Sequence, residues 1–239
     1  MVVRAVPLGG LKRVFSTLFL AILTAFLLGV MNARAEENLT STYSQLFNTL
    51  EIRVGKPVQH VPRAAILSVA LRQLNDQSLQ SSGMQEWRAL VAALQGKPAY
   101  EQVNKVNAFF NRIRYVADGA NGGPSDDWAP PSQFLAKGGD CEDYAIAKFA
   151  TLRALGFTAD QVRLVLVENT ITNKKHAIGA IYLNGQTLLM DNMSQSLRTP
   201  EQVDYYRPIA SLDENRLWVH IRPQSPRNVA ALQRTDKQG

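Results

Sequence analysis

The chain has 239 residues, of which 46% are hydrophobic and 19% are charged, a composition typical of a globular domain with a sizeable core. The formal net charge is +6, but the first 35 residues hold four basic side chains and no acidic one, so the remainder carries only +2. This small excess gives no support for nucleic-acid binding, which depends on a strongly basic surface.

The first 35 residues have the pattern of a secretory signal peptide. Basic residues precede an apolar run from Phe15 to Met31, and Ala33-Arg34-Ala35 follows as a small-x-small cleavage site. We therefore expect export and removal of residues 1–35. An uncleaved membrane anchor is the alternative, but the apolar run is slightly short for a span, which usually needs about 20 residues.

The segments before residue 117 are predicted to be mainly helical. We expect a short helix within residues 36–53, a loop over 54–62 and weak amphipathic character over 64–79. Apolar residues at three- and four-residue spacing predict clearer helices over Met84–Leu94 and Tyr100–Val116.

Residues 117–139 show no periodicity and are rich in Gly, Pro, Asn and Asp, which is typical of a long loop. A loop of this length is uncommon in a compact domain unless it has a function. Trp128 is a large apolar side chain in an otherwise polar stretch, and we expect a single helical turn over Ser132–Leu135. Its acidic and amide side chains are Asp118, Asn121, Asp126 and Asp127.

The only cysteine lies in the stretch Gly138-Gly139-Asp140-Cys141-Glu142-Asp143-Tyr144, directly before a run with helical spacing that Gly156 closes. Cys141 is therefore predicted to begin a helix, where unpaired N–H groups and the helix dipole favour a thiolate nucleophile. A buried, unreactive cysteine is the alternative. The three neighbouring acids argue against an apolar pocket, but they oppose a low thiol pKa, so a bound cation is expected to neutralise them.

The hydrophobic period changes after this helix and predicts strands. The strand segments are Val162–Val167, His176–Leu183, Thr187–Asp191 and Leu217–Ile221. Asn184-Gly185 is a strong short-range signal for a hairpin between the second and third of them. Residues 200–208 are predicted to form a loop, and the polar residues 223–239 a tail that is ordered only in part.

The hairpin turn brings two polar side chains together. A two-residue turn at Asn184-Gly185 places His176 opposite position 193, and Asp191, two residues away, then faces the same side because side chains alternate along a strand. Diagonal neighbours of this kind lie about 7–8 Å apart between backbones, within reach of an imidazole and a carboxylate. A register slip of one residue would instead place them on opposite faces.

These side chains supply the parts for acyl transfer. Cys141 is expected to be the nucleophile, His176 the base that takes its proton, and Asp191 the carboxylate that orients the imidazole. The oxyanion would bind backbone N–H groups at the start of the Cys141 helix, helped by the indole N–H of Trp128 unless that ring only packs. A lone cysteine in an exported protein cannot form an internal disulfide and fits a nucleophile.

Two other histidines compete for the role of base, and Asp191 has an alternative role as a strand-end residue bonded into a turn. His60 lies among prolines with no carboxylate close in sequence, whereas His220 lies on a predicted strand and stays open as a candidate. The joint arrangement of His176 with Asp191 favours the catalytic interpretation.

The same region offers ligands for a hard cation. One cysteine and three scattered histidines do not provide a zinc site, and no phosphate-binding glycine motif is present. Asp140, Glu142 and Asp143, next to a loop rich in Asp and Asn, offer carboxylate oxygens for Ca²⁺, which takes about 6–8 oxygen ligands. A solvated acidic surface is the alternative interpretation.

The core from Gly138 to Ala145, the approach Asp-Trp-Ala-x-Pro-x-x-Phe-Leu over Asp127–Leu135, and the downstream His176 and Asp191 resemble the bacterial transglutaminase-like cysteine proteinases. The resemblance covers about Leu90 to Trp218. The chain order of cysteine, histidine and aspartate is also shared by the wider transglutaminase-like superfamily and by papain-like folds.

The resemblance implies a papain-like, transglutaminase-like α+β fold over residues 36–222, with an N-terminal helical lobe and an antiparallel sheet packed on the Cys141 helix. It implies a calcium-dependent periplasmic protease that releases a large biofilm adhesin by cleaving near its N-terminus, at an Ala-Ala type site. Asp140, Glu142 and Asp143 would bind the calcium. It also implies an inner-membrane receptor that senses cyclic di-GMP and sequesters the protease when this messenger is abundant.

Two other functions are compatible with the same residues. A transglutaminase or amidase would use the same triad and acyl-thioester intermediate, because only the acyl acceptor or the amide attacked differs. A non-catalytic module would hold an extended peptide in the same groove, but it has no need of Cys141, His176 and Asp191 together.

Overall fold

The computed structural model describes residues 41–44, 46–54, 65–119 and 126–222. The chain divides into two units, Met1–Asn38 and Leu39–Gly239, and the following description concerns the second. The expected signal peptide, His60 and the polar tail lie outside the described residues, so the predictions made for them stay predictions.

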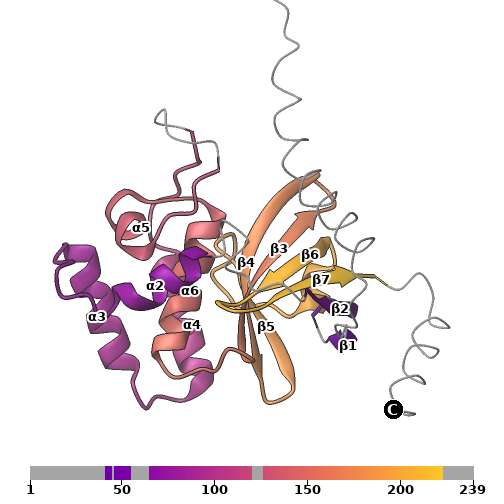
Figure 1. Cartoon of the computed structure of the whole chain (residues 1–239), viewed down its shortest axis with the longest axis horizontal. Helices are drawn as coiled ribbons and strands as arrows, with labels where there is room; N and C mark the ends of the chain where they lie inside the picture. The colour runs from indigo at the N-terminus through magenta and orange to yellow at the C-terminus, as the bar shows by residue number, and fades with distance from the viewer. Residues whose placement is uncertain (1–40, 45, 55–64, 120–125, 223–239) are drawn as a thin grey trace, which may run out of the picture. The chain divides into compact units, whose positions relative to one another are not determined.

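Five helices in the described part of the second unit lie together on one side of the sheet (Figure 1). They are α2 (Ala65–Gln73), α3 (Ser82–Leu94), α4 (Ala99–Phe110), α5 (Pro131–Lys137) and α6 (Cys141–Ala154). The central helix is α6, which contacts α2, α4 and α5 as well as strands β3 (Val162–Asn169) and β4 (Lys174–Leu183). Every residue from Asp143 to Leu152 is buried, as expected for a helix that is covered on all sides.

Seven antiparallel strands form one sheet in the order β1-β2-β7-β6-β3-β4-β5. The remaining elements are β1 (Ser41–Ser44), β2 (Thr49–Arg53), β5 (Gln186–Met190), β6 (Tyr206–Leu212), β7 (Leu217–Ile221) and the 3₁₀ helix η2 (Pro200–Val203). Side chains alternate between two hydrophobic clusters on the two faces; Leu164 of β3 joins the larger, helix-side cluster and Val165 joins the smaller one. Within the described part of the chain, no helix is long and apolar enough to cross a membrane.

The α+β class and the packing of the sheet on the Cys141 helix are as predicted. The helix expected within residues 36–53 is wrong, because β1 and β2 form a hairpin there. Phe47 and Asn48 turn the chain with positive φ angles of 57° and 51°. β2 is then fixed by pairing with β7, a long-range contact that overrides the local helical spacing.

Three other expectations need correction. Residues 200–208 are not all loop, since they contain η2 and the start of β6. Pro208 pairs with Val167 where the β3–β6 register shifts, a position that tolerates a residue without an N–H group. The helix expected over Tyr100–Val116 ends at Phe110, and the single turn expected near residue 133 is the seven-residue α5.

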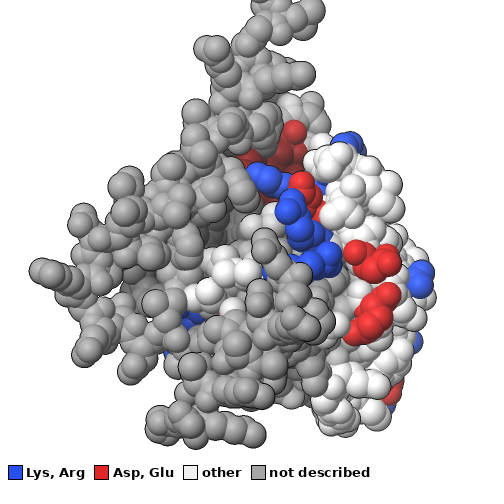
Figure 2. Space-filling model, turned by 90° about the vertical axis from the view of Figure 1, so that its right-hand side faces the viewer, with Lys and Arg blue, Asp and Glu red and all other residues white. Residues whose placement is uncertain are grey.

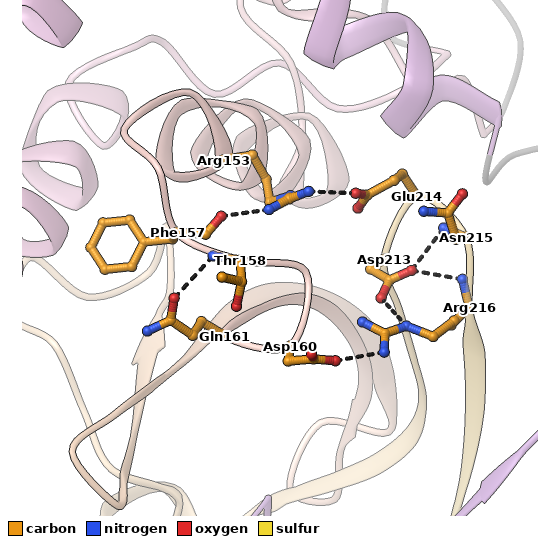
Figure 3. Close-up of polar contacts among 9 residues, drawn as sticks. All are labelled: Arg153, Phe157, Thr158, Asp160, Gln161, Asp213, Glu214, Asn215 and Arg216. Carbon is orange, nitrogen blue, oxygen red and sulfur yellow. Dashed lines mark hydrogen bonds and ion pairs between the residues drawn. The ribbon is translucent and has the colours of Figure 1, made fainter.

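Ion pairs join the end of α6 to the turn between β6 and β7 (Figure 3). Arg153 of α6 donates to Glu214 at 2.6 Å, and Arg216 donates to Asp213 at 2.7 Å and also to Asp160. Asp213 is fully buried and accepts two further backbone N–H groups. These contacts fix the C-terminal end of α6 relative to the sheet, so they help to fix its first residue, Cys141, as well.

The surface carries both signs of charge. On the face shown in Figure 2, basic and acidic side chains lie near one another over the described part, so neither sign covers that face.

A buried histidine links the neighbouring strands β2, β7 and β6. His220 of β7 contacts the hydroxyls of Thr49 on β2 and Ser211 on β6, each at 2.8 Å. Burial, opposed by the charge of Glu51 and assisted by that of Arg163, lowers the pKa of His220 to about 4 from 6.5. His220 therefore belongs to the sheet and remains neutral in the folded protein near pH 7.

This histidine predicts acid sensitivity. Between pH 6.5 and about 4 the unfolded state binds a proton at position 220 and the folded state does not, so the free energy of unfolding should fall as pH falls through this window. The loss should approach about 3 kcal/mol at full effect. Urea unfolding of wild type and His220→Gln at pH 7 and pH 4.5 checks it; an equal loss in both proteins would contradict the assignment.

Candidate active site

Cys141 is the first residue of α6, and the backbone before it is tightly packed. Asp143 accepts the N–H groups of Asp140 at 3.1 Å and Ala129 at 2.7 Å, which ties the helix start to the preceding loop. A Cβ atom at Gly139 would lie 2.0 Å from the Asp143 carboxylate, so only glycine allows this approach. The Gly pair thus serves to place Cys141 at an ordered helix N-terminus.

The Cys141 thiol is half-buried and lies next to an acid and a strand. Its Sγ donates to Glu142 Oε2 at 3.1 Å and accepts the backbone N–H of Ala177, the residue after His176 on β4. Burial raises the pKa of the thiol, the charge of Glu142 raises it further, and the Ala177 N–H opposes both. The helix start alone therefore does not produce a thiolate here, and the acids must first be neutralised.

His176 and Asp191 meet as the hairpin register predicts. Leu183 pairs with Gln186 across Asn184-Gly185, and His176 Nε2 lies 2.8 Å from Asp191 Oδ1. Because Nε2 faces the carboxylate, Nδ1 is the ring nitrogen left for proton transfer with a thiol. The structure thus brings the predicted base and carboxylate together, on the strand whose Ala177 contacts Cys141.

Asp191 is held by two further donors that sequence reasoning missed. Tyr206 of β6 donates its hydroxyl to Oδ2 at 2.8 Å, and the Met193 N–H donates to Oδ1 at 2.9 Å. Burial alone would raise the pKa of Asp191, but the hydrogen bond and charge of His176, together with these donors, hold it below its ordinary value. The carboxylate is therefore kept ionised and fixed in place.

Two asparagines, one in α4 and one at its C-cap, fix the loop that follows Asp191. Asn111 donates its side-chain amide to the backbone carbonyls of Asp191 at 2.9 Å and Ser194 at 2.8 Å. Asn107, one turn earlier and fully buried, donates to the carbonyls of Ser194 and Gln195. The periodicity of α4 predicts a buried face, but not that Asn107 and the C-cap residue Asn111 would hold this loop.

Acidic side chains around Cys141 form two groups of closely spaced potential metal ligands that share Glu142. One holds Asp140, Cys141 and Glu142, and the other Asp118, Asp126 and Glu142, with ligand atoms within 4.8 Å of one another in each. Burial and the neighbouring Glu142 raise the pKa of Asp140 to about 8, and its Oδ1 is buried without a hydrogen-bond partner among the described residues. Carboxylates this close repel one another, and their donor set suits a hard cation such as Ca²⁺.

The three predicted calcium ligands therefore do not all lie together. Asp140 and Glu142 belong to these groups, whereas the carboxylate of Asp143 is occupied by two backbone N–H groups and lies outside both. The long Asp-rich loop was the signal for Asp118 and Asp126, but sequence alone did not select them. Trp128 is half-buried and packs against the larger hydrophobic cluster, so an oxyanion role for it stays a prediction.

Comparisons with known proteins agree with this geometry. The family described as bacterial transglutaminase-like cysteine proteinase, BTLCP, matches residues 79–226. LapG of Legionella pneumophila is 31% identical, with a TM-score of 0.54 over 64% of this chain and 85% of that one. Its calcium-bound structure is 27% identical, with a TM-score of 0.55 over 70% of this chain and 99% of that one. An EGTA-treated LapG structure also matches, whereas a comparison with curated proteins found no match.

The Tyr206 contact can be tested with a matched neighbour. Tyr206→Phe removes one of the donors that fix the Asp191 carboxylate in place, so Asp191 should orient His176 less well for proton transfer with the thiol. We expect the alkylation rate of Cys141 by iodoacetamide at pH 7 to fall about tenfold, since a hydrogen bond to a charged group contributes about 1.5–3 kcal/mol. Tyr205→Phe is the control; if both variants react alike, the contact has no such role.

Proposed function

Because the chain belongs to the bacterial transglutaminase-like cysteine proteinases, we propose that it is a calcium-dependent cysteine endopeptidase with Cys141, His176 and Asp191 as its triad. The observation that carries the proposal is the contact of 2.8 Å between His176 and Asp191. His176 lies on β4, the strand whose Ala177 N–H donates to the thiol. A peptide-binding module would need neither this contact nor a thiol at a helix start.

The residues suggest a two-step reaction. Cys141 Sγ, after giving its proton to His176, attacks the carbonyl carbon of the scissile peptide, and the developing oxyanion meets N–H groups at the start of α6. His176 then protonates the departing amine, which leaves an acyl-thioester on Cys141. Water, activated by His176, hydrolyses this thioester and restores the thiol. Asp191 holds the imidazole orientation throughout and stabilises its protonated form.

We assign the calcium site to Asp140, Glu142, Asp118 and Asp126. The calcium-bound and EGTA-treated structures of LapG support a calcium site in this family. A bound Ca²⁺ would supply positive charge beside the thiol and offset the repulsion among these acids. Its carboxylate ligands must be ionised, so with the pKa of Asp140 raised to about 8, binding should strengthen as pH rises toward 8.

The biological setting follows from the family resemblance. We propose that the substrate is the N-terminal region of a large surface adhesin, which the protease releases in the periplasm. An inner-membrane receptor that senses cyclic di-GMP would sequester the protease when the messenger is abundant. The resemblance of the core from Gly138 to Ala145 supports these assignments, and the chain's own surface adds no separate argument for them.

Cleavage of an adhesin N-terminal fragment from the same cell tests the proposal. The chain from residue 36 should cut the fragment, and Cys141→Ala should lower the rate by at least about a thousandfold while the fold is retained, because triad members act as a unit. Circular dichroism serves as the folding control. If the fragment stays intact while Cys141 is still alkylated, the peptidase proposal fails, and acyl transfer to an amine or amide hydrolysis takes its place.

A variant of Glu142 tests calcium binding separately from the triad, because Glu142 belongs to both groups of potential metal ligands. Glu142→Gln should weaken calcium binding, measured by calorimetry, by about tenfold or more, and calcium should no longer accelerate cleavage. Without calcium, the same variant should alkylate slightly faster than wild type, since an anion beside the thiol is gone. Asp127→Asn is the control, because Asp127 lies in the loop that holds Asp118 and Asp126 but belongs to neither ligand group. Wild-type calcium affinity in Glu142→Gln would refute the assignment.

A further inference from the structure

The backbone of Asp191 lies just past the end of a strand. The ladder between β4 and β5 ends with the pair of Gly179 and Met190, and Asp191 follows one residue later. The chain turns at once, because Asp191 Oδ1 accepts the Met193 N–H at 2.9 Å and the Asp191 carbonyl accepts the Ser194 N–H at 3.3 Å. The residue that holds the imidazole therefore begins a turn, and a turn needs contacts beyond the ladder to keep it in one place.

Asn111 supplies such a contact from the helical side. It is the C-cap residue of α4, and its side-chain amide donates to the Asp191 carbonyl at 2.9 Å and to the Ser194 carbonyl at 2.8 Å. The first of these carbonyls belongs to the same residue whose carboxylate lies 2.8 Å from His176 Nε2. One amide group thus spans both ends of the turn and fixes the Asp191 backbone relative to α4.

Asn107 makes a similar contact with a different part of the loop. It lies four residues earlier, on the same face of the helix, and donates to the carbonyls of Ser194 at 3.2 Å and Gln195 at 3.3 Å. Asn111 therefore holds the beginning of the loop, which includes Asp191, whereas Asn107 holds the part that follows. The two side chains form a natural pair for comparison.

The amide donors are what these two asparagines contribute. The acceptor oxygen Oδ1 of each side chain is buried without a hydrogen-bond partner among the described residues, which is unfavourable. Each NH₂ group, in contrast, directs its two donors at two carbonyls. An apolar side chain would avoid the unpaired oxygen but could not hold these carbonyls, so the contribution of Asn111 lies in the turn that it holds.

We propose that Asn111 is a positioning residue, whose amide holds the Asp191 backbone so that the Asp191 carboxylate keeps His176 oriented for proton transfer. Asn111 acts only through Asp191. The proposal rests on the proposed peptidase function for its kinetic consequence, but the effect on His176 can be measured without a substrate.

The test compares three variants of the chain. Asn111→Ala removes the donors to the Asp191 turn, Asn107→Ala removes the donors to the next part of the loop, and Asn111→Gln keeps an amide on a longer side chain. Thermal unfolding, kcat and KM for the adhesin fragment, and the low-field proton NMR signal of His176 Nε2–H are measured for each. The signal is assigned by its loss in His176→Ala.

Asn111→Ala should lose about tenfold or more in kcat with little change in KM, as expected for a group that orients a catalytic side chain. Its His176 signal should shift or exchange faster. Asn107→Ala should lower the unfolding temperature by at least as much, because Asn107 is fully buried, but it should keep more of the kcat and a signal nearer to that of wild type. Asn111→Gln should lie between Asn111→Ala and wild type in both measurements.

Other results would overturn the proposal. If Asn111→Ala keeps the wild-type kcat or the wild-type His176 signal, Asn111 does not position the triad. If Asn107→Ala changes both as much as Asn111→Ala does, the asparagines only order the loop, and Asn111 has no separate role toward Asp191. Should either alanine variant fail to fold, Asn111→Ser and Asn107→Ser, which keep a hydroxyl donor, give the same comparison.

Failure of the peptidase function is distinguishable from failure of this proposal. If wild type does not cleave the fragment, the peptidase function fails, and the NMR comparison alone decides the role of Asn111. An unchanged His176 signal in Asn111→Ala then refutes it, and a signal displaced in Asn111→Ala but not in Asn107→Ala supports it.

Discussion

The burial of α6 on every side is the constraint on which the rest of the structure depends. Because α2, α4 and α5 cover it from one side and β3 and β4 from the other, its axis is fixed, and so is the position of Cys141 at its first turn. His176, the proposed base, lies on β4, one of the strands that α6 contacts. Thus the distance between the proposed nucleophile and the proposed base is set by the same packing that forms the core.

Electrostatics at the site work against the thiolate form of Cys141 unless a cation is present. Burial and Glu142 both raise the pKa of Cys141, and Asp140 acts in the same direction. Asp191, in contrast, is surrounded by donors and remains ionised despite its burial. The two halves of the site therefore differ: the His176–Asp191 half is organised by the protein alone, whereas the Cys141 half contains clustered acids whose repulsion a bound calcium would relieve.

Local sequence signals predicted the parts of the site that depend on short-range geometry. The Asn184-Gly185 turn fixed the register of His176 and Asp191, and the Gly pair before Cys141 indicated the helix start. Tyr206 and Asn111 reach Asp191 or its loop from elements 15 and 80 residues away in the chain, and no periodicity reports such contacts. The same limit explains the errors over β1, β2 and β6, whose strand state depends on pairing with distant strands rather than on local propensity.

The pairing of buried charges separates Lys148 from other charged residues of the fold. Arg163 and Glu51, which join β3 to β2, form a 2.6 Å ion pair, and the guanidinium lies 3.8 Å from the centroid of the Trp218 ring. Arg153 and Glu214, at the end of α6, form another ion pair of 2.6 Å. Each of these four side chains, like Asp140, leaves one buried polar atom without a hydrogen-bond partner among the described residues, whereas Lys148 leaves its only polar side-chain atom, Nζ, without one. A buried amine without a partner costs stability locally, and such places are where function is expected.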